Sequence, residues 1–107
     1  MTRPLVEIVY FDGCPSYHAA RELVDRVIVE MGGEADVRLV DVASEESARQ
    51  ERFLGSPSIR VNGRDIEPGA DVRADYVLSC RLYRTDGGFV GQPDEVWLRE
   101  ALSEALR

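Results

Sequence analysis

The sequence contains no lysine, a single histidine and only two cysteines, and it has no Cys-x-x-Cys pair. Its 13 basic residues are all arginines and stand against 20 acidic residues, which gives a net charge of −7. A chain of this charge is poorly suited to a phosphate backbone, so we expect no nucleic-acid partner. A structural zinc site needs four Cys or His ligands, more than this chain has, so we expect no metal centre of that kind.

Long hydrophobic runs are also absent, although hydrophobic residues make up 44% of the 107-residue chain. No segment approaches the ~20 apolar residues of a membrane-spanning helix, so we expect no membrane partner. The first apolar stretch holds Glu7 and ends at Asp12, which is unlike a secretory signal. We therefore expect a cytoplasmic protein with one domain, residues 1–107. Structural disulfides are rare in that compartment, so its two cysteines indicate chemistry or a place in the core.

One stretch combines a strand, a tight turn and a cysteine. The almost unbroken apolar run 5–11 predicts a strand covered on both faces, and Asp12-Gly13 ends it. Cys14 then stands where we expect the N-cap of a helix, with Pro15 at the first helical position. The helix dipole and unpaired N–H groups there favour a thiolate over a thiol. Cys14 is thus a candidate reactive thiol; the alternative is a small buried apolar residue.

The rest of the chain predicts further strands and helices. Apolar residues at steps of three and four indicate helices that bury one face. Asn62-Gly63 is a strong signal for a two-residue hairpin. The expected elements are strands at 35–42 (parallel to the first), 59–61 and 64–66, and helices from Cys14 to Met31, from Ser44 to about Leu54, and from Pro93 onward.

The stretch that contains the second cysteine, Cys80, has two interpretations. The expected strand 64–66 runs back towards the Cys14 end of the sheet, so residues 67–92 can leave the sheet there and fold over Cys14 as a lid. Alternatively, the alternation of residues around Leu78 and Leu82 indicates a strand in which Cys80 is ordinary core.

The order of elements and two landmarks resemble the thioredoxin-like fold over about residues 5–106. One landmark is Cys14-Pro15 at the start of a helix, and the other is the loop Gly55-Ser56-Pro57-Ser58-Ile59, with Pro57 43 positions after Cys14. The resemblance implies a four-stranded mixed sheet with helices on both faces. It also implies an insertion, about 67–92, between the last strand and the C-terminal helix. Finally, it implies that Pro57 is cis, lies close to the Cys14 sulfur and shapes a substrate-binding edge.

The sequence departs from thioredoxins at Tyr17, which stands where they have the second cysteine. Tyr-Phe-Asp-Gly-Cys-Pro resembles a group of small bacterial thioredoxin-like proteins, some with names linked to organomercurial lyases. The resemblance implies a thiol-based redox protein, in which Cys14 attacks a thiol, disulfide or peroxide substrate and Cys80 is the candidate resolving thiol. One alternative is a soft-metal or organomercurial-binding protein that uses Cys14 and Cys80 as ligands. The other is an interaction scaffold without chemistry.

No motif in the sequence requires an organic or metal cofactor. Four side chains near the landmarks are candidates for substrate binding, each with packing or solvation as the alternative: Tyr17, His18, Ser56 and Ser58. His18 lies one helical turn from Cys14, where it could stabilise a thiolate or move a proton. Four arginines either line an anion site or form a solvated charged face: Arg60, Arg64, Arg81 and Arg84.

Overall fold

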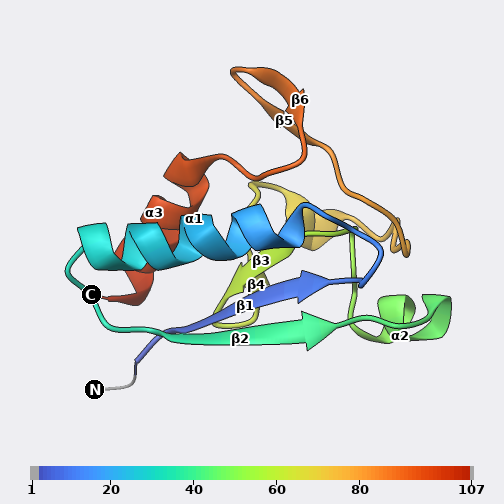
Figure 1. Ribbon diagram of the computed structural model, residues 1–107, viewed down its shortest axis with the longest axis horizontal. Helices are drawn as coiled ribbons and strands as arrows, with labels where there is room; N and C mark the ends of the chain where they lie inside the picture. The colour runs from blue at the N-terminus through green and yellow to red at the C-terminus, as the bar shows by residue number, and fades with distance from the viewer. Residues whose placement is uncertain (1–2, 107) are drawn as a thin grey trace.

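The central strand β1 (Leu5–Tyr10) organises the sheet of the computed structural model, which describes residues 3–106 (Figure 1). The strand order is β2-β1-β3-β4. The edge strand β2 (Asp36–Asp41) is parallel to β1, whereas β3 (Ser58–Val61) is antiparallel to β1 and β4 (Arg64–Asp65) is antiparallel to β3. This is the mixed four-stranded sheet predicted from the sequence.

The two long helices cover one face of this sheet. α1 (Tyr17–Glu30) and α3 (Glu95–Ala105) bury one apolar stripe each, as their spacing predicts. The core between them and the sheet consists of Val6, Ile8, Ala20, Val24, Val27, Ile59, Val61, Ile66, Leu98 and Leu102. In Figure 1, α1 crosses in front of the strands, which places its first residues at the end towards which β1 runs.

The opposite face of β1 has a smaller core. The short helix α2 (Glu45–Gln50) contributes Ala48, which packs with Val9 of β1 and with Phe53. Helices therefore lie on both faces, although α2 ends well before the expected Leu54. It ends at Gln50 because Arg52 has a left-handed backbone (φ 55°) that an α-helix cannot contain.

The start of α1 also differs from the prediction, which placed Cys14 at the N-cap. The helix begins at Tyr17, and Ser16 is the N-cap residue whose carbonyl accepts the first helical bond, from the Ala20 N–H. Cys14 lies two residues earlier, where its own N–H donates to the Phe11 carbonyl and closes the turn after β1. The hairpin at Asn62-Gly63 is confirmed, because both residues have positive φ as a type I′ turn requires.

Residues 67–92 lie between β4 and α3 and contain little regular structure. They hold a single turn of 3₁₀ helix, η1 (Ala70–Val72), and a hairpin of β5 (Tyr83–Thr85) and β6 (Gly88–Val90) that projects from the body (Figure 1). The strand expected around Cys80 does not form: Cys80 and Leu82 are exposed, and only one isolated bridge joins Cys80 to Ser56. The interpretation of Cys80 as core is therefore wrong.

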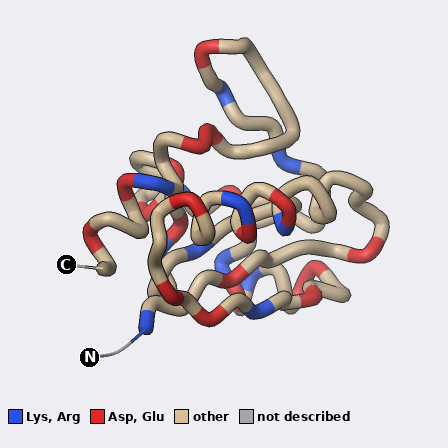
Figure 2. Tube along the Cα trace, turned by 60° about the vertical axis from the view of Figure 1, so that its left-hand side comes forward, with Lys and Arg blue, Asp and Glu red and all other residues tan. Residues whose placement is uncertain are grey.

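Charges are mixed over the surface, with acidic residues and arginines interspersed along the chain (Figure 2). A cluster of ion pairs joins α1 to α3, in which Arg26 contacts Glu95 (2.6 Å) and Arg99 contacts Glu30. Within residues 3–106, no helix is long and apolar enough to cross a membrane.

Candidate functional site

A segment of the insertion is fixed alongside the loop that contains Pro57. We call residues 77–83 the strap and residues 53–58 the proline loop. Three backbone hydrogen bonds join them: Val77 N–H to the Phe53 carbonyl (2.9 Å), Ser56 N–H to the Ser79 carbonyl (2.8 Å) and Arg81 N–H to the Ser56 carbonyl (2.8 Å). The strap thus forms a short parallel pairing with the proline loop, and both backbone groups of Ser56 are occupied by it.

The contact between strap and proline loop is close enough to require glycine at Gly55. This residue has φ 118°, a conformation that side chains with a Cβ rarely adopt. A Cβ at this position would also lie 2.8 Å from the Cβ and 3.2 Å from the Cα of Arg81. Gly55 therefore lets the backbone of the strap approach the loop.

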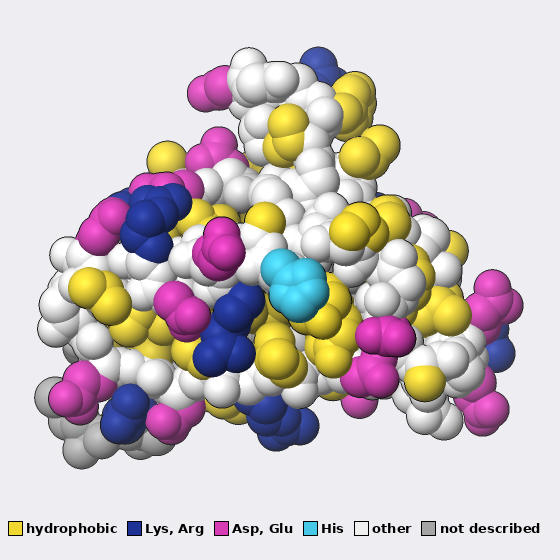
Figure 3. Space-filling model, viewed as in Figure 1, with side chains coloured by type: hydrophobic (Ala, Val, Ile, Leu, Met, Phe, Trp, Pro, Cys, Tyr) yellow, Lys and Arg dark blue, Asp and Glu magenta, His cyan; other side chains and the backbone are white. Residues whose placement is uncertain are grey.

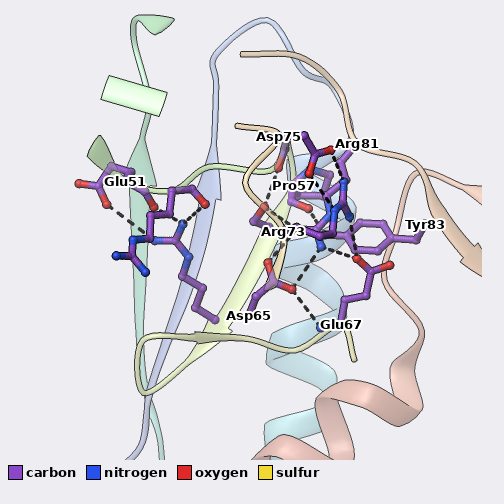
Figure 4. A network of polar contacts seen from close by, with 12 residues as sticks. Glu51, Pro57, Asp65, Glu67, Arg73, Asp75, Arg81 and Tyr83 are labelled. Atoms are coloured by element: carbon purple, nitrogen blue, oxygen red, sulfur yellow. Dashed lines mark hydrogen bonds and ion pairs between the residues drawn. The ribbon is translucent and has the colours of Figure 1, made fainter. Parts of the chain in front are cut away.

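The side chain of Arg81 anchors the strap in a buried polar network (Figure 4). Its guanidinium is only 2% exposed and donates to Ser58 Oγ (2.9 Å), Asp65 Oδ2 (2.7 Å) and Glu67 Oε1 (2.7 Å). The pKa of Arg81 is raised: burial would lower it, but the hydrogen bonds and charges of Asp65 and Glu67 outweigh burial. Arg81 thus belongs to neither the anion site nor the solvated face considered above, because its charge is balanced internally.

Tyr83 adds a second anchor at the end of the strap. Its side chain is fully buried, its ring lies 4.4 Å below the Arg81 guanidinium, and its hydroxyl donates to the Pro57 carbonyl (2.5 Å). Burial raises the pKa of Tyr83, so the hydroxyl stays protonated and keeps donating. The Ser56–Pro57 peptide bond is cis. The strap thus contacts both residues of that bond: Arg81 N–H binds the Ser56 carbonyl, and the Tyr83 hydroxyl binds the Pro57 carbonyl.

Cys14 lies beneath this arrangement and is fully buried. Its sulfur contacts the Ser56 carbonyl at 3.5 Å, which brings Cys14 next to the proline loop. In the thiol form Sγ–H donates to that carbonyl. The Ser56 hydroxyl is also buried, and it has no hydrogen-bond partner among the described residues. An unpaired buried hydroxyl beside a sulfur is a donor available to a thiolate.

The pKa of Cys14 is lowered from its ordinary value. Burial acts to raise it, but hydrogen bonds from the Ser56 side chain, the Ser16 backbone and the Cys80 thiol favour the thiolate and outweigh burial. The Ser16 N–H belongs to the N-cap of α1, so the start of the helix still supplies a donor although Cys14 itself precedes the cap. Hydrogen bonds to the sulfur therefore favour the Cys14 thiolate that the sequence predicts.

Cys80 occupies the exposed side of the same site. It stands in the strap between Ser79 and Arg81, whose backbone groups bond Ser56, and it is bridged to Ser56, the residue whose carbonyl the Cys14 sulfur contacts. A hydrogen bond with Cys14 is the main cause that raises the pKa of Cys80, and partial burial adds to it. Both cysteines are free, with Cys14 buried and Cys80 exposed.

The other sequence candidates have different places. Ser58 is buried, and its hydroxyl donates to the Gly55 carbonyl (2.6 Å) and accepts from Arg81, so it stabilises the loop. Tyr17 stacks on Tyr10 (4.3 Å between ring centroids) and contacts His18 (4.0 Å). His18 is exposed and is the cyan residue in Figure 3. Neither ring makes a described hydrogen bond with Cys14.

Sequence reasoning missed the anchoring roles of Arg81 and Tyr83. The strand-like alternation around them indicated a sheet, and nothing local shows that Arg81 pairs with carboxylates 14 and 16 residues earlier. A surface groove of about 410 Å³ lies between β4, η1 and α3 and is lined by neither cysteine. Among the described residues, no three His, Cys, Asp or Glu side chains cluster as metal ligands.

No protein-family model matches the chain, and no curated protein matches it. The structure is similar to the crystal structure of a Selenoprotein W-related protein from Vibrio cholerae, with a TM-score of 0.56. The two share 17% sequence identity, over 99% of this chain and 100% of that chain. The likeness is one of fold: a mixed four-stranded sheet with three helices, consistent with the thioredoxin-like fold of that neighbour.

Proposed function

We propose that the protein carries out thiol–disulfide exchange with Cys14 and Cys80 as its redox pair. The observation that carries the proposal is the position of both cysteines at Ser56: the buried Cys14 sulfur lies 3.5 Å from the Ser56 carbonyl, and the exposed Cys80 is bridged to Ser56 from the strap. The lowered pKa of Cys14 and the raised pKa of Cys80 agree with this position. The strap thus supplies the second thiol that the motif Cys14-Pro15-Ser16-Tyr17 lacks. The fold shared with a Selenoprotein W-related protein gives weaker support.

The reaction transfers two electrons to a disulfide substrate. A cysteine thiolate of the pair attacks one substrate sulfur, and a mixed disulfide forms while the other substrate sulfur leaves as a thiolate. The second cysteine then attacks the protein sulfur of that mixed disulfide and releases the remaining substrate thiolate. The protein ends with a Cys14–Cys80 disulfide and the substrate with two thiols. The Cys14 sulfur lies against the carbonyl of Ser56, the residue that precedes the cis peptide bond to Pro57.

The test is the intact mass of the protein after a mild oxidant, with maleimide labelling and dithiothreitol as the reducing control. We expect the loss of two hydrogens and the protection of both cysteines, reversed by dithiothreitol. After oxidation and labelling in denaturant, Cys14→Ser and Cys80→Ser should each keep their remaining cysteine available to maleimide and form no internal disulfide. One oxidised thiol beside one free thiol in the wild-type protein would contradict the redox pair.

The same pair of cysteines favours a second candidate function, a binding site for a soft metal ion. Two adjacent thiolates suit such ions, although the described residues offer no third Cys, His or carboxylate ligand. If this is the function, Cys80→Ser weakens the affinity for mercury(II) or arsenite, and the wild-type protein shows no disulfide reductase activity. Unchanged metal affinity in Cys80→Ser, with no internal disulfide in the wild type, would leave the interaction scaffold.

A further inference from the structure

The two sulfurs of the pair differ in what can reach them. Cys14 has no exposed surface, because the proline loop, the start of α1 and the strap enclose it. Cys80 in the strap is exposed. The anchors Arg81 and Tyr83 are buried and bind Asp65, Glu67 and the Pro57 carbonyl, which fixes the strap in place.

We propose that external sulfur enters and leaves the site at Cys80, and that Cys14 is the internal thiol that closes and opens the protein disulfide. The sequence alone suggested the opposite order, with Cys14 attacking the substrate and Cys80 resolving. The proposal rests on the proposed function, since it assigns the roles of the two cysteines within that reaction.

The step is an exchange at the Cys80 sulfur. An external thiolate, from a small thiol or a protein cysteine, attacks Cys80 Sγ of the oxidised protein. The bond between the external sulfur and Cys80 forms as the Cys14–Cys80 bond breaks, and the electron pair leaves on Cys14 as a thiolate. A second external thiolate attacks the external sulfur of the mixed disulfide and releases Cys80. In total the protein gains two electrons and two external thiols become a disulfide.

The reverse direction passes through the same intermediate. The Cys80 thiolate attacks one sulfur of a substrate disulfide, whose S–S bond breaks as the other substrate sulfur leaves as a thiolate. The Cys14 thiolate then attacks Cys80 Sγ and expels the remaining substrate thiolate. Both directions keep Cys14 inside the protein, where the Ser56 and Ser16 donors surround its sulfur.

The electrostatics of the site agree with this order. In thiol–disulfide exchange the sulfur with the lower pKa leaves faster. Hydrogen bonding lowers the pKa of Cys14 against the effect of its burial, and the contact with Cys14 raises the pKa of Cys80. Attack at Cys80 therefore expels the better leaving group, whereas attack at Cys14 would require entry to a buried sulfur and expel the poorer one.

The deciding experiment locates the mixed disulfide in the wild-type protein. Oxidised protein is mixed with excess reduced glutathione, quenched with acid at early times and digested with trypsin. Cleavage at arginine separates the cysteines, because Cys14 lies in the peptide that ends at Arg21 and Cys80 in the peptide 74–81. We expect glutathione on the peptide 74–81. Glutathione on the peptide that ends at Arg21 would overturn the order while leaving the redox pair intact.

Single-cysteine variants provide a second, kinetic measurement. Serine is close to cysteine in size, so Cys80→Ser keeps the cover over Cys14. We expect Cys14 in the Cys80→Ser variant to react with dithiodipyridine at least about tenfold more slowly than Cys80 in the Cys14→Ser variant. Burial slows the reaction of Cys14 although its pKa is the lower of the two. Faster reaction of Cys14 would overturn the proposal. Failure of the redox pair itself appears separately, as the absence of any internal disulfide in the oxidised wild-type protein.

Discussion

At the scale of single residues, Ser56 contributes both backbone groups and its side chain to the site. Its N–H and carbonyl bind the strap, its carbonyl also contacts the Cys14 sulfur, and its buried hydroxyl is free to donate to the thiolate. Only the hydroxyl can be removed without altering the backbone contacts. Its loss therefore separates the chemistry of Cys14 from the attachment of the strap.

We predict that Ser56→Ala raises the pKa of the Cys14 thiol, because the strongest donor to the thiolate is lost. A titration of thiolate ultraviolet absorbance against pH, in the Cys80→Ser background, measures this. In the wild type, the lowered pKa of Cys14 stabilises the folded protein above the ordinary thiol pKa, and this stabilisation is lost as the pH falls through the lowered value. Ser56→Ala should flatten that part of the stability profile.

Ser103→Ala serves as the control, since Ser103 is exposed on α3. It should leave both the titration and the stability profile unchanged. An unchanged Cys14 titration in Ser56→Ala would show that the backbone N–H of Ser16 lowers the pKa without the hydroxyl.

At the scale of elements, the strap is held by three backbone hydrogen bonds and by a few strong side-chain contacts. Arg81 is the principal contact, with its guanidinium between Asp65 and Glu67 and against the Tyr83 ring (Figure 4). Removing one partner from a buried ion pair leaves the other charge buried and unpaired. The free energy lost in this way is larger than the net stabilisation that the intact pair provides.

We predict that Arg81→Met lowers the free energy of unfolding by about 3–5 kcal/mol, as for other broken buried pairs. Arg84→Met is the matched control, because Arg84 is exposed in the projecting hairpin, and its effect should stay within about 0.5 kcal/mol. Urea unfolding measures both. Arg81→Met should also make Cys14 accessible to maleimide without denaturant. Equal stability of the two variants would contradict the anchoring role.

This contrast explains which elements the sequence could predict. The Asn62-Gly63 hairpin and the apolar stripes of α1 and α3 could be predicted, because turn conformation and helical spacing are determined by residues close together in the sequence. The position of the strap depends on contacts of Arg81 with Asp65 and Glu67, which are distant in the sequence and meet only in the folded chain. Placing Cys14 at the N-cap was wrong by two residues, since the bond from Cys14 N–H to Phe11 closes a turn before α1 begins.

At the scale of the whole molecule, a disulfide between Cys14 and Cys80 would join the N-terminal part of the chain to the insertion. The bond closes a loop of roughly 65 residues, for which chain entropy gives a stabilisation of about 4 kcal/mol. We predict that the oxidised protein unfolds at higher urea concentration than the reduced protein, with a gain up to about that size. Cys80→Ser should show no difference between oxidising and reducing conditions. Equal stability of the two wild-type forms would contradict an internal bond.

The pairing of Ser56 with the strap has a consequence for partners. An extended peptide can bind a protein by adding a strand to a free backbone edge, and its affinity then comes from main-chain hydrogen bonds. At Ser56 that edge is already filled by the protein's own residues 79–81. A partner therefore has no main chain to pair with at this position, and under the proposed function it is selected by the shape and charge of the surface around the exposed Cys80.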